Sequence, residues 1–168
     1  VEQILGTAYR MSIKEDVVND AFDPIENGLP STYPLGIKRL IRQAIINLKY
    51  YVESEDYSQY VFPALRALEG HIKYLITLAG GIAGRKFTCF GYDGTVIPNK
   101  YVVKEAFPDK SKNIYLENCY NYYVSQRNSL FHFGDVLNEA CDNTRSINTK
   151  AEADEIIKNC IDLISTQQ

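Results

Sequence analysis

Apolar residues recur every three or four positions over long stretches of this sequence, and this spacing restricts the fold more than any other feature. The spacing matches the 3.6-residue turn of an α-helix, in which such residues share one face. One stretch contains Ile37, Leu40, Ile41, Ala44, Ile45 and Leu48, and another contains Val61, Leu65, Leu68, Ile72, Leu75 and Ala79. Helices with a single apolar face must pack on one another, so the pattern predicts a helical bundle.

Four long helices are expected from this pattern and from local start and stop signals. They cover about residues 37–53, 58–79, 110–131 and 151–165. Pro63 is expected in the first turn of the second helix, which stops at Gly80-Gly81. Thr149 is expected to cap the last helix, with Glu152 completing a capping box.

Two regions lie outside this helical pattern. FTCFGYDGTVIP alternates in polarity and contains Asp93-Gly94, which predicts a small β-hairpin in an insertion at about residues 82–108. Residues 1–15 carry a short helical pattern, and residues 16–36, with three prolines and two glycines, are expected to form a loop. The predicted fold is mainly α: a bundle of about four helices at residues 35–168, preceded by a segment or linker at residues 1–34.

Composition excludes several classes of protein. The 168 residues suffice for one domain, and a net charge of −3 argues against coating nucleic acid by bulk electrostatics, although a local basic site remains open. Tyr74–Ala83, the longest apolar stretch, is too short to span a membrane. The four cysteines are far apart, so we expect reduced thiols, no zinc site and no cofactor. The sequence starts at Val1 without a secretory signal, so we expect part of a longer cytoplasmic protein.

Arg127 interrupts the apolar stripe of the third predicted helix, four residues after Tyr123 and three before Leu130. Burying a guanidinium group costs several kcal/mol unless it is paired and hydrogen-bonded. One explanation is an internal ion pair with Glu69, which lies at the edge of the stripe of the second helix. The other is a functional site.

His132, one of only two histidines, follows Arg127 by five residues. On an ideal helix this is a rotation of roughly 140°, so the two side chains converge only if the helix loosens near its end, where Gly134 occurs. Asn128 shares a face with His132 and is expected to orient its imidazole. An imidazole that moves a proton and an arginine that binds phosphate are the groups needed to cleave RNA without a metal ion.

The hexapeptide R-N-S-L-F-H, at residues 127–132, resembles the signature of the HEPN superfamily: an arginine, a polar residue and a histidine at the end of a helix in a four-helix bundle. This resemblance implies a metal-independent ribonuclease that forms a 2′,3′-cyclic phosphate. It also implies a homodimer, with motifs from both protomers in one cleft.

More narrowly, the sequence resembles the C-terminal domain of the RNase LS toxins of the RnlA/LsoA type. The resemblance is carried by FPALRALEGHIKYLI, GGIAGRKF and RNSLFHFGD, and extends from about Gly36 onward. It implies an mRNA-cleaving toxin in which Glu69 joins Arg127 and His132 in the active site. It further implies that this domain forms the dimer and binds an antitoxin, either cognate or phage-encoded, in an antiviral defence system.

Other residues have two interpretations. Arg66, Lys73 and Tyr122 are candidates for RNA binding, but Lys73 is also placed for a pair with Glu69 at i,i+4, and the tyrosines are also placed for packing. His71 is expected to be a packed or surface residue. The alternative function is a noncatalytic helical module for dimerisation and antitoxin binding, and a third is a noncatalytic partner of a nucleotidyltransferase.

Overall fold

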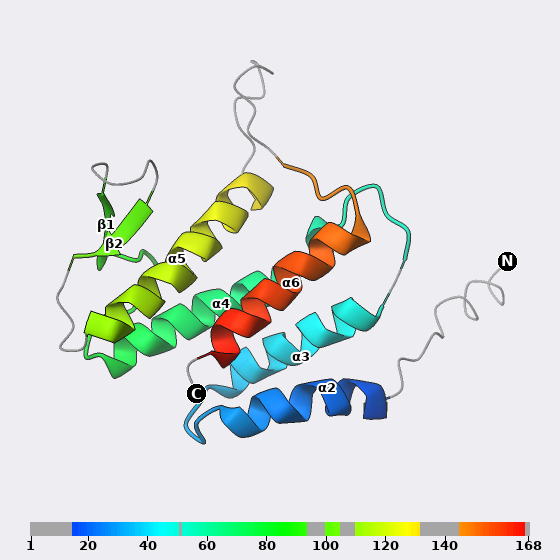
Figure 1. The fold of residues 1–168 in the computed structure, drawn as a ribbon, viewed down its shortest axis with the longest axis horizontal. Coiled ribbons are helices and arrows are strands. Elements are labelled where there is room, and N and C mark those ends of the chain that lie inside the picture. Colours follow the sequence, from blue (N-terminus) through cyan, green and yellow to red (C-terminus); the bar gives the residue numbers. More distant parts are fainter. Residues whose placement is uncertain (1–14, 51, 94–99, 105–109, 132–144, 167–168) are drawn as a thin grey trace, which may run out of the picture.

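The computed structural model describes residues 15–50, 52–93, 100–104, 110–131 and 145–166. The elements in chain order are α2 (Glu15–Gly28), α3 (Leu35–Lys49), α4 (Ser58–Leu78), β1 (Phe90–Asp93), β2 (Lys100–Val103), α5 (Lys110–Phe131) and α6 (Lys150–Ser165). The predicted mainly α bundle with a small hairpin is confirmed (Figure 1). None of these helices is both long and apolar enough to cross a bilayer.

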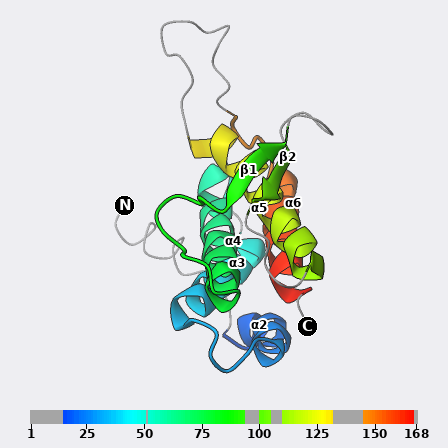
Figure 2. The same cartoon turned by 90° about the vertical axis from the view of Figure 1, so that its left-hand side faces the viewer.

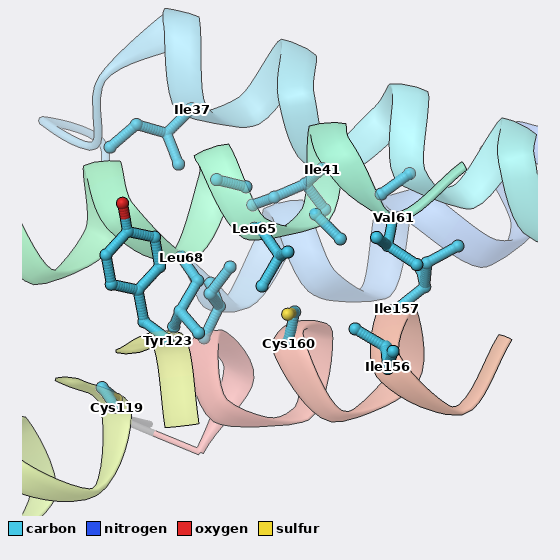
Figure 3. Packing of buried hydrophobic residues seen from close by; sticks show 14 of the residues in the cluster. Ile37, Ile41, Val61, Leu65, Leu68, Cys119, Tyr123, Ile156, Ile157 and Cys160 are labelled. Carbon is cyan, nitrogen blue, oxygen red and sulfur yellow. The ribbon is translucent and has the colours of Figure 1, made fainter. Parts of the chain in front are cut away.

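Helix α4 is the centre of the bundle, because it packs against α3, α5 and α6. Its apolar residues Leu65, Leu68 and Ile72 are fully buried, as the periodicity predicted. Figure 3 shows side chains of α3, α4 and α6 gathered in this core, with Cys160 among them. Each fully buried aliphatic side chain contributes about 1.5–3 kcal/mol, so the shared core fixes the position of α4.

The expectation of a loop before residue 37 is wrong for the part that forms α2. Val18 and Phe22 are buried, and the helix packs against α3. Pro24 lies inside α2 with its side chain exposed, so the helix continues past a residue that usually ends one. The short helix expected within residues 1–15 falls almost wholly outside the described residues, and the domain division at residues 34 and 35 stays a prediction.

The other helix boundaries are close to those expected. Helices α5 and α6 begin and end within a residue of their predicted limits, and Thr149 Oγ1 accepts a hydrogen bond from the Glu152 amide at 3.2 Å. Helix α3 ends earlier than predicted, at Lys49. Helix α4 starts at Ser58, which places Pro63 beyond the first turn.

The hairpin is antiparallel and docks on α5. Phe90 pairs with Val103 and Asp93 pairs with Lys100, so residues 94–99 connect the strands, rather than a two-residue turn at Asp93-Gly94. Asn121 of α5 bonds both backbone groups of Tyr101, at 2.7 and 2.8 Å, and thereby satisfies part of the edge of β2. The hairpin and α2 lie on opposite sides of the molecule (Figure 1, Figure 2).

The chain that leads into α6 is held at two points. Arg145 donates to Gln126 Oε1 of α5 at 2.9 Å and forms an ion pair with Glu152 of α6. Asp56, just before α4, accepts a hydrogen bond from the Ile147 amide at 3.1 Å. These contacts join α4, α5 and α6 at one end of the bundle.

Candidate functional site

A surface pocket of about 180 Å³ lies between α4 and α5 and is called the α4–α5 pocket below. Its lining residues are Phe62, Leu65, Arg66, Glu69, Tyr123 and Arg127. Residues three, four and seven apart on α4 share one face, and residues four apart on α5 do the same. The structure therefore brings together Arg66, Glu69 and Arg127, three of the residues expected to act in the site.

Glu69 is bonded through both carboxylate oxygens. Its Oε1 is 2.5 Å from Lys73 Nζ, and its Oε2 accepts a hydrogen bond from the Tyr123 hydroxyl at 3.1 Å. Burial by itself raises the pKa of Glu69, but the Lys73 hydrogen bond and charge, the Tyr123 hydroxyl and the Arg127 charge outweigh it and lower the pKa below its usual value. Glu69 is thus a carboxylate at neutral pH.

Arg127 is half-buried and lines the α4–α5 pocket without forming an ion pair with Glu69 or any other residue that the structure describes. The expected alternative of an internal Arg127–Glu69 ion pair is therefore wrong. Arg127 Nη1 donates a hydrogen bond to Asn128 Oδ1. At 3.5 Å this bond is long and therefore weak. Among the described residues, the rest of the guanidinium fork faces the pocket without a carboxylate partner, a geometry that suits a ligand oxygen.

Lys73 forms the i,i+4 pair with Glu69 that the sequence offered as one interpretation. Its ammonium group also lies 5.5 Å from the centre of the Phe87 ring. These two contacts direct Lys73 to the Glu69 carboxylate, and it does not line the α4–α5 pocket as described.

Tyr123 is a site residue that the sequence interpretation missed, because its place in the apolar stripe indicated only packing. It is buried, and burial, followed by the charge and hydrogen bond of Glu69, raises its pKa to about 12. The hydroxyl therefore stays protonated and serves as a donor. Its position four residues before Arg127 was the available signal, since this spacing places both on one face of α5.

Three other candidates lie elsewhere. Tyr122 lines a separate groove between α5 and α6, with Asn118, Asn159 and Asp162, so it is not part of the α4–α5 pocket. Asn128 is exposed and contacts Arg127 at the rim. His132 lies outside the described residues, so its place relative to Arg127 stays a prediction.

His71 is buried inside the bundle, as one of the two interpretations expected. Its Nδ1 is 2.7 Å from the Tyr33 hydroxyl and its Nε2 is 2.9 Å from the Tyr115 hydroxyl. Tyr115 donates its proton to the Leu163 carbonyl, so its oxygen accepts from Nε2–H, and Nδ1 accepts from Tyr33. Burial lowers the pKa of His71 to about 4, which keeps the ring neutral.

No group of three or more His, Cys, Asp or Glu side chains is placed to hold a metal ion among the described residues. Cys89, Cys119 and Cys160 are buried and form no disulfide with one another, which agrees with the expected packing role. Cys141 is outside the described residues.

Comparison with known proteins agrees with this fold. The family model "RNase LS, bacterial toxin DBD domain" matches residues 14–134. The chain is 31% identical over 161 residues to the mRNA endoribonuclease LsoA of Escherichia coli O157:H7, an alignment that covers 90% of this chain and 44% of that protein. It therefore spans less than half of that relative.

A solved structure, Escherichia coli toxin LsoA in complex with T4 phage antitoxin Dmd, has the same fold. The TM-score is 0.76 at 24% sequence identity, and the match covers 98% of this chain and 64% of that chain. Because the family model matches most of this sequence, the chain belongs to the RNase LS bacterial toxin family.

Proposed function

We propose that this chain is the metal-independent endoribonuclease domain of a bacterial toxin that cleaves mRNA in the cytoplasm. Its relative LsoA is named an mRNA endoribonuclease. The observation that carries the proposal is the α4–α5 pocket, where Arg127 stands beside an ionised Glu69 without being paired to it. An arginine placed in this way binds a phosphate group through its forked donors.

The proposed reaction is attack of a ribose 2′-hydroxyl on the adjacent phosphorus. His132 accepts the 2′-hydroxyl proton, the bond from phosphorus to the 5′-oxygen breaks, and that oxygen takes up a proton. The products are a 2′,3′-cyclic phosphate and a 5′-hydroxyl. Arg127 stabilises the negative charge that builds on the phosphate oxygens.

The other residues support this pair. Glu69 attracts the Arg127 guanidinium across the pocket and so positions it, while Lys73 and Tyr123 hold Glu69. Arg66 supplies a second cation to the RNA backbone. Asn128 orients the imidazole of His132. A homodimer brings two such motifs into one cleft.

The test is RNA cleavage by the full-length protein with Arg127→Ala or His132→Ala. We expect each change to lower the cleavage rate by about 100-fold or more, since a single transition-state donor is worth about 10²–10³ in rate. Products of the unchanged protein should carry a cyclic phosphate, and EDTA should not inhibit. The matched control is Arg39→Ala, which removes an exposed arginine of α3. Full activity in both site variants rejects the assignment.

The second candidate function is a noncatalytic module for dimerisation and antitoxin binding. It is favoured by the complex of LsoA with the antitoxin Dmd, whose toxin chain shares this fold. Under this hypothesis Arg127→Ala leaves cleavage unchanged, while deletion of this domain abolishes antitoxin binding and dimer formation. Pull-down with antitoxin and light scattering measure both.

A further inference from the structure

Phe62 exposes 45% of its surface although it lines the α4–α5 pocket. It lies one helical turn before Arg66, and the Arg66 guanidinium carbon is 5.6 Å from the centre of the Phe62 ring. This cation–π contact orients the ring at the rim of the pocket. An exposed aromatic ring beside two guanidinium groups calls for an explanation, since apolar rings are ordinarily buried.

We propose that Phe62 is a stacking platform for the nucleobase next to the phosphate bound by Arg66 and Arg127, so that the site selects unpaired RNA. This inference rests on the proposed function and names the form of its substrate.

The size of the α4–α5 pocket supports a phosphate bound inside it and a base held outside it. At about 180 Å³ it is smaller than the roughly 300–1,000 Å³ of sites that enclose a whole small-molecule ligand. A phosphate group enters such a pocket, but the attached base stays outside. Phe62 is the exposed aromatic residue of the lining, so its ring is the apolar face that the pocket offers to that base.

The charges in the α4–α5 pocket favour an anion despite the net charge of −3 for the whole chain. Arg66 and Arg127 contribute two positive charges to the lining, and Glu69 is already bonded to Lys73. Cations that track the backbone combined with an aromatic face are typical of single-stranded nucleic acid binding. In a duplex the bases are stacked on one another and are not offered to such a ring.

The experiment compares Phe62→Leu with Phe62→Tyr in the full-length protein. The probe is a single-stranded 2′-O-methyl RNA oligonucleotide that contains 2-aminopurine, whose fluorescence falls when the base stacks on a ring. We expect quenching by the unchanged protein and by Phe62→Tyr. Phe62→Leu should bind roughly ten- to a hundred-fold more weakly and lose most of the quenching. On cleavable single-stranded RNA it should raise KM more than it lowers kcat.

Tyr92→Leu is the matched control, since Tyr92 is an exposed aromatic residue of β1 outside the pocket, and it should bind like the unchanged protein. Equal binding and quenching by Phe62→Leu overturns the platform, even if Arg127→Ala abolishes cleavage. If Phe62→Leu instead weakens only antitoxin binding, Phe62 is a protein contact and the proposal is wrong. Loss of quenching in Phe62→Leu, with no RNA cleavage by the unchanged protein, keeps the platform and rejects the nuclease function.

Discussion

Glu69 and His71 lie two residues apart on α4, yet their side chains have opposite surroundings: one faces a surface pocket and the other the core. His71 is fully buried, and each ring nitrogen has a tyrosine hydroxyl as its partner. Glu69 is also bonded through both oxygens, but it faces a pocket in which Arg127 forms no ion pair with any described residue. Both groups have a shifted pKa, but the proposed function assigns a role only to Glu69, because it faces a second charged group in a pocket.

The largest expected effect is the difference in stability loss between substitutions on the core side and on the pocket side of α4. His71→Ala should lower the free energy of unfolding by about 3–5 kcal/mol, because it leaves a cavity and removes the acceptor of the Tyr33 hydroxyl. Glu69→Gln, the matched change on the pocket side, should cost no more than about 1 kcal/mol. Urea unfolding measures both, and equal losses would contradict the comparison.

The pH dependence of stability should also report His71. Its pKa is about 4 in the folded chain and 6.5 in the unfolded chain, so the unfolded chain binds the extra proton between these values. Stability is therefore lost as the pH falls from 6.5 to 4, by about 3 kcal/mol in total. His71→Gln, which does not titrate, should lack this part of the slope. Parallel stability profiles for the two proteins would show that the imidazole is not held neutral.

The smallest expected effect concerns the hydrogen bond from Tyr123 to Glu69. Tyr123→Phe should raise the pKa of Glu69, because it removes a donor to the charged form, and should cost about 1–2 kcal/mol of stability. Carbon NMR titration of labelled glutamate gives the pKa, with Glu69→Gln to assign the signal. Tyr120→Phe is the control, since its ring stacks on Phe90 rather than bonding Glu69. An unchanged pKa of Glu69 in Tyr123→Phe would contradict the claim that this hydroxyl holds Glu69.

Much of the bundle could be predicted from sequence because its long helices carry apolar residues at helical spacing, even where Arg127 interrupts the stripe of α5. Helix α5 follows its predicted range, since Leu116, Tyr123 and Leu130 recur on one face and are buried. Helix α2 contradicts the predicted loop, because the prolines, glycines and Asn/Asp residues of 16–36 indicate breaks in helical structure. The spacing of Val18 and Phe22 was the contrary signal, and burial against α3 outweighs the cost of the proline.

The candidate site was predictable in its charged residues and in the i,i+4 pair of Glu69 with Lys73, but not in its contacts between helices. Arg127 and Glu69 were recognisable as charges at the edge of apolar stripes, yet sequence spacing cannot tell which cation a carboxylate selects across a bundle. The local partner Lys73 holds Glu69, and Tyr123, 54 positions away, completes its bonding. The partners of His71 lie 38 and 44 positions away, beyond any local pattern.

The bridge made by Arg145 to Gln126 and Glu152 has a consequence for how this chain tolerates insertions. It fixes Arg145, which precedes α6, against Gln126 of α5 and Glu152 of α6, so the bundle holds both sides of the connection. The entropy of closing a loop grows only with the logarithm of its length, so doubling the loop costs about 0.6 kcal/mol. An insertion between residues 133 and 144 should therefore cost the bundle little, whereas one between Asn128 and Phe131 would interrupt α5 and displace the buried Leu130.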